Sequence, residues 1–182
     1  RDTERILRHA AHLGHYIADA CTPLHTTRWY NGRTPGERGI HALWESRIPE
    51  LFSDGFCFLS GRAVYIEDPL AEAWNLVRES HLKTDSIYRA LDRATKGMST
   101  WQQFAVEVRG SQIQRVYSMA FCELLHKEMD QMTERQMRRA VGAVGSFWFT
   151  AWVNAGQPDL KASTKKPKRL LQRLMRMGKH AD

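Results

Sequence analysis

The 182-residue chain contains few cysteines and no long apolar run. Its three cysteines, Cys21, Cys57 and Cys122, leave at least one thiol unpaired, and none belongs to a Cys-x-x-Cys pair. The sequence therefore predicts neither a thiolate zinc knuckle nor a thioredoxin-like redox site. No stretch approaches the roughly 18 apolar residues of a membrane span. A signal peptide is also missing, and because the chain begins with Arg1 we expect it to be a fragment or a processed product.

The formal net charge of +7 is concentrated at the carboxyl end of the chain. Residues 161–182 contain eight lysines and arginines against one acidic residue, Asp182, so residues 1–160 carry no net charge. This location argues against a nucleic-acid-binding role for the globular part. We predict one domain over residues 1–160 and a basic, flexible tail over 161–182 that makes weak contact with anionic polymers or membrane surfaces.

Apolar residues recur at three- and four-residue steps along most of the chain, which predicts an all-α, multi-helix fold. The predicted helices span 1–21, 40–52, 69–94, 111–132 and 133–155, with a loop over 26–39 and a short extended piece within 57–65. Asp68 followed by Pro69 is typical of a helix start. Thr133 and Gln136 form a capping-box pattern at the start of the last helix. Residues 143–153 are apolar nearly all round, which predicts a centrally buried helical segment.

Five potential metal ligands occur in the first quarter of the chain, with the spacing His-x3-Asp-x5-His-x15-His-x3-Glu. They are His15, Asp19, His25, His41 and Glu45. Because residues four apart lie on one face of a helix, the first two and the last two ligands form pairs on two separate helices. The middle histidine comes from the loop after the first helix. Two such pairs that converge on one pocket predict a site for more than one metal ion.

Zinc is the metal that this ligand set favours. It accepts imidazole nitrogen and carboxylate oxygen, and catalytic zinc sites keep an open position for water. His25, His41 and Glu45 supply three ligands of the kind that zinc hydrolases use. His15 and Asp19 supply two, so a second ion there needs further ligands, and the carboxylate is able to bridge two ions. The remaining histidines are predicted to be ordinary core or surface residues; they are His9, His12, His81, His126 and His180.

The strings HLGHYIADACTPLHTTRWYNG and GIHALWESRIPELF resemble the metal core of the zinc-dependent phospholipase C and single-strand-specific nuclease superfamily. The shared pattern is His-x3-Asp-x5-His, with Pro-Leu or Pro-Met before the second histidine, and then His-x3-Glu or His-x3-Asp after a variable loop. The resemblance implies an all-α fold with three zinc ions. It implies that His25, His41 and Glu45 bind one zinc. It further implies that His15 binds a second ion and that Asp19 bridges this ion and a third.

The sequence favours the phospholipase branch of the superfamily. Glu45 is typical of the phospholipases, whereas the nucleases' Gly-Gly-Asn step is replaced by Asn31-Gly32 and their His-x-x-Trp-Asp motif is missing. Trp44 is a nuclease-like feature, and Thr22 stands where both branches often have Gln. We therefore expect a zinc-dependent, phospholipase C-like hydrolase of phosphodiester bonds in which metal-activated water is the nucleophile. The alternatives are a single-strand-specific nuclease of the same fold and a noncatalytic, zinc-stabilised helical binding module.

The resemblance covers only part of the family's site. The family also uses an amino-terminal Trp, an early His and an Asp-His pair from the first half of the protein, so we expect these ligands and the general base upstream of Arg1. Trp29 and Tyr30, in the loop after His25, are candidates for the walls of a substrate pocket, with ordinary loop packing as the alternative. The expected substrate is a phospholipid or another phosphodiester, nucleic acid included. The family's usual location predicts a secreted or periplasmic protein.

Overall fold

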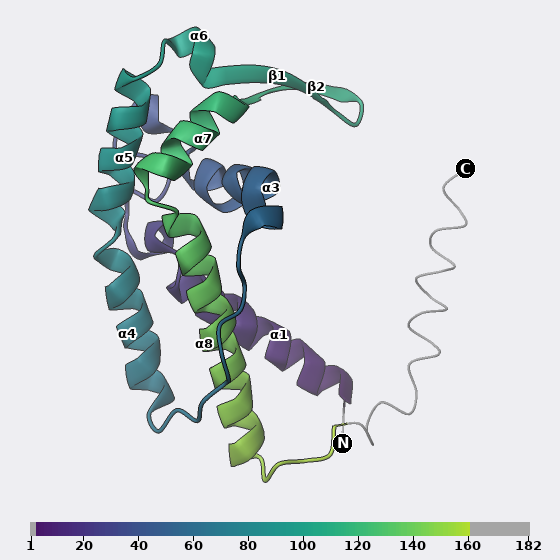
Figure 1. The fold of residues 1–182 in the computed structure, drawn as a ribbon. Helices are drawn as coiled ribbons and strands as arrows, with labels where there is room; N and C mark the ends of the chain where they lie inside the picture. The colour runs from purple at the N-terminus through teal and green to yellow at the C-terminus, as the bar shows by residue number, and fades with distance from the viewer. Residues whose placement is uncertain (1–2, 161–182) are drawn as a thin grey trace, which may run out of the picture.

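The computed structural model describes residues 3–160, which are mostly helical with one two-stranded antiparallel sheet (Figure 1). The predicted helical class is confirmed for the bulk of the fold, and the sheet corrects the prediction that every element is a helix. The predicted tail, residues 161–182, lies outside the described residues. No helix in the described part is long and apolar enough to cross a membrane.

The elements follow the predicted order, with additional short turns of helix. The long helices are α1 (Thr3–Ala20), α4 (Pro69–His81), α5 (Thr84–Lys96), α7 (Met119–Glu128) and α8 (Met132–Asn154). The short ones are η1 (Pro23–Thr26), η2 (Pro35–Glu37), α2 (Ile40–Ala42), η3 (Leu43–Arg47), α3 (Ile48–Phe52), η4 (Ser53–Gly55) and α6 (Thr100–Gln103). The strands are β1 (Phe104–Arg109) and β2 (Gln112–Tyr117).

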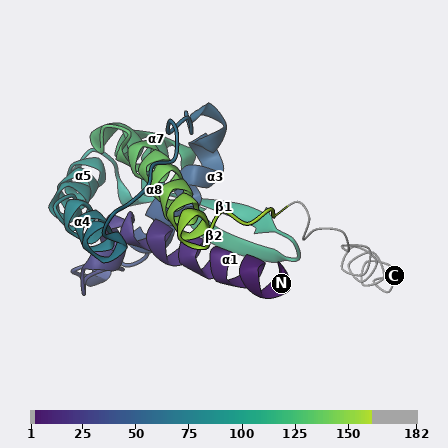
Figure 2. The ribbon, with the colours of Figure 1, turned by 90° about the horizontal axis from the view of Figure 1, so that it is seen from below.

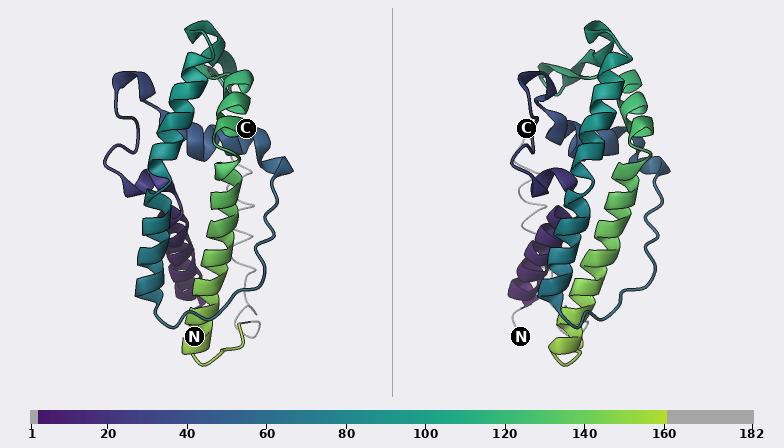
Figure 3. Two further views of the ribbon diagram at one scale, coloured as in Figure 1. Left: turned by 60° about the vertical axis from the view of Figure 1, so that its left-hand side comes forward. Right: turned by 90° about the vertical axis from the view of Figure 1, so that its left-hand side faces the viewer.

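Two pairs of consecutive helices lie side by side (Figure 3). One pair is α4 followed by α5, and the other is α7 followed by α8. The larger core lies around α5, α7, η1 and the α2–η3–α3 segment, where side chains such as Leu24, Ile48, Tyr88 and Phe121 are almost fully buried. A burial of this kind stabilises each large apolar side chain by about 1.5–3 kcal/mol.

Helix α1 packs against α8 at a position without a side chain (Figure 2). Gly14 is buried on α1, and a Cβ atom there would lie 3.0 Å from Cζ2 of Trp148 on α8. The indole Nε1 of Trp148 donates a hydrogen bond to the carbonyl of Ala10 at 2.9 Å. A smaller core that includes Ile17 and Phe147 fills the rest of this interface. The absence of a side chain at position 14 therefore allows the close approach of the two helices.

Helix α8 buries one face only, which corrects the prediction of a centrally buried segment at 143–153. Ala143 and Phe147 lie in the smaller core, whereas Trp148 is 46% exposed. The predicted capping box is also wrong: α8 begins at Met132, and Thr133 lies inside its first turn with a fully buried side chain. The Gln136 side chain instead donates a hydrogen bond to the carbonyl of Cys21 at 2.6 Å, because tertiary packing brings the end of α1 to it.

The predicted helix over 69–94 is divided into α4 and α5. Its predicted start is confirmed, since Asp68 Oδ1 accepts a hydrogen bond from the amide of Ala71 at 3.0 Å. The division falls at Leu82 and Lys83, where the backbone makes a turn and the leucine is 80% exposed. The sequence 57–65 contains no strand and crosses α8, to which the amides of Val64 and Ile66 donate side-chain hydrogen bonds.

The hairpin β1–β2 replaces the first part of the helix predicted over 111–132. Its register pairs Phe104 with Tyr117 and Val108 with Ile113. A two-residue loop joins the strands, and its first residue, Gly110, has a φ of +61°. Glycine adopts positive φ without steric cost, and such two-residue loops match the twist of antiparallel strands. The β-branched residues on both strands favour this pairing over a helix.

Candidate metal centre

The end of α1 and the turn after it place three of the predicted ligands. His15 and Asp19 lie one turn apart on α1, where Nε2 of the histidine is 3.4 Å from Oδ2 of the aspartate. The helix ends at Ala20, and Pro23 then begins the single turn η1, since the fixed φ of proline suits a first helical position. Pro23 and Leu24 are buried, which fixes the backbone of His25 beside α1.

The second pair of ligands lies on a helical segment that contains a π turn. His41 is on α2, and Glu45 is on the π-helical turn η3. Pro49 explains the wider turn, because proline has no amide hydrogen to donate to the carbonyl of Glu45 and its ring crowds that carbonyl. Single π turns of this kind often occur at functional sites. The predicted helix over 40–52 is thus confirmed in extent, with a local geometry that the sequence pattern did not predict.

His25, His41 and Glu45 converge into one cluster of ligand atoms. Nε2 of His25 lies 2.8 Å from Nε2 of His41 and 3.1 Å from Oε1 of Glu45. Nε2 of His41 lies 2.9 Å from Oε2 of Glu45. Each residue offers one ligand atom, and these atoms all lie within 4.8 Å of one another. The three side chains remain between 28% and 31% exposed, so the cluster is open to solvent on one side.

The chemistry of these donors matches a zinc ion. Two imidazole nitrogens and one carboxylate oxygen are a common catalytic zinc set, with bond lengths of about 2.0–2.2 Å in tetrahedral geometry. Tetrahedral bonds of that length put neighbouring donors about 3.3–3.5 Å apart. The three atoms lie 2.8–3.1 Å apart, so the side chains would have to separate slightly to hold the ion. The solvent-facing side leaves room for a fourth ligand. Among the described residues, these three form the group that is able to hold a metal ion.

Asp19 and His15 lie at the edge of this cluster. Oδ1 of Asp19 is 3.3 Å from Nδ1 of His25, on the side of the ring opposite the clustered nitrogen. A carboxylate in that place favours a proton on Nδ1 and so leaves Nε2 free to bind a metal. His15 is more exposed, at 67% of its side chain, and reaches Asp19 alone among the predicted ligands. The prediction that these two residues hold further ions stays a prediction.

A hollow of about 590 Å³ opens beside the two histidines of the cluster, whereas Glu45 lines a separate hollow of about 710 Å³ between the end of α1, η3 and α8. The hollow beside the histidines is lined by Tyr16 and Asp19 from α1, by His25 and His41, and by Tyr30 from the connecting loop. The Tyr30 ring meets the His41 ring edge-on, with the ring centres 5.6 Å apart. Tyr30 therefore lies beside two of the predicted ligands, and its role as a wall of a substrate pocket stays a prediction. Trp29 lines a neighbouring hollow instead, where the Arg28 guanidinium lies 4.5 Å from its ring centre.

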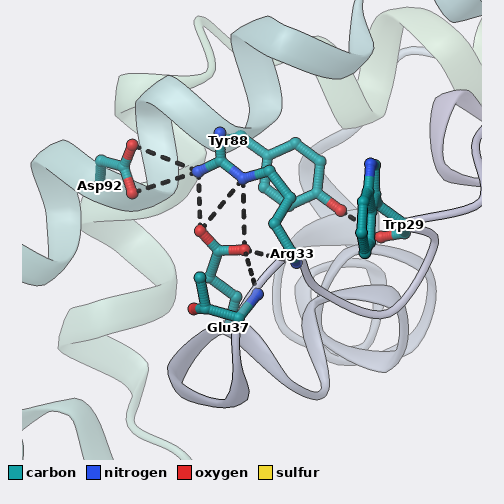
Figure 4. A network of polar contacts seen from close by, with 6 residues as sticks. Trp29, Arg33, Glu37, Tyr88 and Asp92 are labelled. Atoms are coloured by element: carbon teal, nitrogen blue, oxygen red, sulfur yellow. Dashed lines mark hydrogen bonds and ion pairs between the residues drawn. The ribbon is translucent and has the colours of Figure 1, made fainter.

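The loop between the two ligand pairs is anchored to α5 by a polar network (Figure 4). The Arg33 guanidinium lies 4.1 Å from the centre of the Tyr88 ring, 2.7 Å from Oε1 of Glu37 and 3.3 Å from Oδ2 of Asp92. The Tyr88 hydroxyl donates a hydrogen bond to the carbonyl of Trp29. Burial alone would raise the pKa of Glu37, but hydrogen bonds from Arg33 lower this pKa below its ordinary value. The network therefore holds a charged Glu37 in place.

Two glycines allow the same loop to close. Gly32 has a φ of +119°, and a Cβ atom there would lie 2.8 Å from the backbone of Glu37. Gly39 has a φ of +98° and donates its amide hydrogen to Oδ1 of Asn31 at 3.0 Å. Positive φ at both positions is available to glycine at little cost. The closed loop brings η1 and α2 together, so His25 meets His41.

Sequence reasoning missed the anchoring residues of this loop. One local signal was present, since Thr34 and Glu37 form a capping box around η2, with the Thr-x-x-Glu pattern. The contacts to Tyr88 and Asp92 join residues far apart in the chain, and no local pattern indicates them. Two other histidines keep the ordinary role predicted for them: His126 is half-buried between aromatic rings, and His81 lies beside Thr26.

Comparisons with protein-family models, with curated proteins and with solved structures give no match for this chain. The identity and the geometry of His25, His41 and Glu45 are therefore the evidence for a metal centre.

Proposed function

We propose that this chain is a zinc-dependent hydrolase of phosphodiester bonds, similar to zinc-dependent phospholipase C. The observation that carries the proposal is the convergence of His25, His41 and Glu45 into one cluster, whose two histidines line a hollow of about 590 Å³. A structural zinc site is usually closed by four protein ligands, whereas a catalytic site has three and an open position. The three ligands and the open side support a catalytic role.

The residues around the ligands have defined tasks in this proposal. Asp19 holds the proton on Nδ1 of His25 and so directs Nε2 toward the metal. The edge of Tyr30 fixes the ring plane of His41 and forms one wall of the hollow that would admit the phosphodiester. A zinc ion bound here would supply Lewis acidity toward a phosphoryl oxygen and toward water.

Zinc binding and hydrolysis are measured together on the 182-residue chain. We expect zinc to bind the wild-type chain and a His9→Ala control, and His41→Ala and Glu45→Gln to lower its affinity at least about tenfold. Hydrolysis is assayed on phosphatidylcholine and on single-stranded DNA with the same zinc-loaded chain.

Each outcome has a defined meaning. Cleavage of phosphatidylcholine that depends on Glu45 supports the proposal, and cleavage of DNA alone replaces it with a nuclease of the same kind. Tight zinc binding without hydrolysis of either substrate would overturn the catalytic role and leave a zinc-stabilised binding module. Zinc affinity unchanged by both ligand substitutions would overturn the site itself.

A further inference from the structure

The hairpin β1–β2 presents an apolar face to solvent. Side chains alternate between the two faces of a strand, so the register puts six residues on one face. They are Phe104, Val106 and Val108 on β1 and Ile113, Arg115 and Tyr117 on β2. The three aliphatic side chains near the loop are 71–76% exposed, although each is β-branched and apolar.

The base of the hairpin packs against the helices, so the apolar side chains are exposed while the hairpin is anchored in one conformation. The Phe104 and Tyr117 rings lie 4.8 Å apart, and Tyr117 stacks on Phe121 of α7 at 5.2 Å. On the opposite face, Glu107 pairs with the buried Arg47 of η3, which also donates to the carbonyl of Tyr117. The outer half of the hairpin extends away from the helices (Figure 1).

We propose that this apolar face of the hairpin docks on the surface of an anionic phospholipid bilayer. The charge of the face supports an anionic bilayer, because Arg115 is the charged residue among the six and none of them is acidic. The net charge of +7 comes from residues 161–182, and residues 1–160 carry no net charge. Acidic Glu107 lies on the other face, where Arg47 neutralises it. Trp101, directly before the hairpin, is 93% exposed, and tryptophan favours the boundary between water and lipid.

The size of the face also favours a bilayer over a protein partner. A stable protein–protein interface takes roughly 800 Å² from each partner, which three aliphatic side chains do not provide. A lipid surface needs no complementary shape. The free energy of binding to it is the sum of two contributions, the transfer of each inserted apolar side chain out of water and the attraction between cationic residues and anionic lipid. The proposal does not use the zinc site, so the failure of zinc binding or of hydrolysis would not affect it.

Flotation of the 182-residue chain with mixed phosphatidylcholine–phosphatidylglycerol vesicles tests the proposal. We expect the wild-type chain to float with the vesicles, and Val108→Asp with Ile113→Asp to lower the bound fraction about tenfold. A matched control, Leu59→Asp with Leu82→Asp, changes two aliphatic side chains that are 86% and 80% exposed elsewhere and should bind like the wild type. High salt screens the basic residues 161–182, so the hairpin's share of binding should persist there.

A second pair of substitutions separates lipid binding from folding. Val108→Thr with Ile113→Thr keeps β-branched side chains in both strands, and it should leave the thermal melting curve unchanged while it lowers flotation. Wild-type flotation equal to that of both hairpin variants would overturn the proposal, as would no flotation of the wild type. A wild-type dimer that the hairpin variants convert to monomers would also overturn it, in favour of an interface between copies of the chain.

Discussion

His126 shows what the packing of one side chain implies for the pH dependence of stability. Its ring lies between Phe52 and Phe56, with ring centres 5.3 and 5.5 Å away, and its Nδ1 atom is buried without a hydrogen-bond partner in the described structure. Burial lowers the pKa of His126 below its ordinary value of 6.5, and nearby Glu134 only partly opposes this. The folded protein therefore prefers the neutral imidazole.

We predict that the stability due to neutral His126 is present above pH 6.5 and is lost as the pH falls below that value. The unfolded chain binds a proton on this side chain more readily than the folded chain, so acid favours unfolding. Urea unfolding at pH about 7.5 and about 5.5 measures the loss, and His126→Phe, which keeps the stacking, should reduce it. An equal loss in the variant would show that other groups cause the pH dependence.

At the scale of residues, the spacing in the sequence was enough to predict which side chains meet. His25, His41 and Glu45 converge because two helical pairs and one proline-directed turn obey local rules. The anchoring contact from Tyr88 to the carbonyl of Trp29 depends on α5 lying beside the loop, which is a tertiary property. Local rules therefore predict the ligands, and the residues that hold them required the structure.

At the scale of elements, Pro49 sets the geometry of the ligand helix. Pro49→Ala would restore an amide hydrogen opposite the carbonyl of Glu45, so the π turn η3 should relax toward an α-helix and rotate Glu45 away from His25. We predict a fall of about tenfold in zinc affinity, the usual effect of disturbing the residues that orient a ligand.

A competition assay with a chelating dye measures this affinity. The matched control is Pro69→Ala, a proline in the first turn of α4, which should leave zinc affinity unchanged. The thermal melting temperature of Pro49→Ala should not fall, because the substitution replaces a helix-breaking residue. Unchanged zinc affinity in Pro49→Ala would show that the π turn does not position Glu45.

The elements were predicted well where apolar periodicity was strong and poorly where tertiary contacts decided the outcome. The helices over 3–20, 40–52 and 132–154 match their predictions closely. The segment 112–117 forms a strand because β1 pairs with it and Gly110 turns the chain, whereas its helical period is weak. The break at Leu82 carries no proline or glycine, so nothing local marks it.

At the scale of the whole molecule, α1 connects the ligand cluster to the longest helix, α8. The contact between Gly14 and Trp148 joins residues far apart in the sequence, and the required glycine is recognisable only once the two helices are placed together. Helix α8 in turn holds the connector before α4 through its Ser146 and Thr150 hydroxyl groups. The placement of the ligands thus depends on packing at the opposite end of the chain.

Two glycine-to-alanine substitutions test this packing. Alanine in place of glycine inside a helix stabilises by about 0.5–1 kcal/mol, and Gly145→Ala in α8 should show this gain because its new Cβ atom lies 3.8 Å from its nearest neighbour. Gly14→Ala should forfeit the gain, because the Trp148 ring at 3.0 Å must move. Urea unfolding measures both, and equal gains would show that the α1–α8 contact is looser than described.

The most direct test of the metal centre is zinc X-ray absorption spectroscopy on the zinc-loaded chain. We predict nitrogen and oxygen donors at about 2.0–2.2 Å with the scattering of imidazole rings, and the loss of one imidazole in His41→Ala. Sulfur donors at about 2.3 Å, or the same number of imidazoles in wild type and His41→Ala, would contradict a site built from His25, His41 and Glu45.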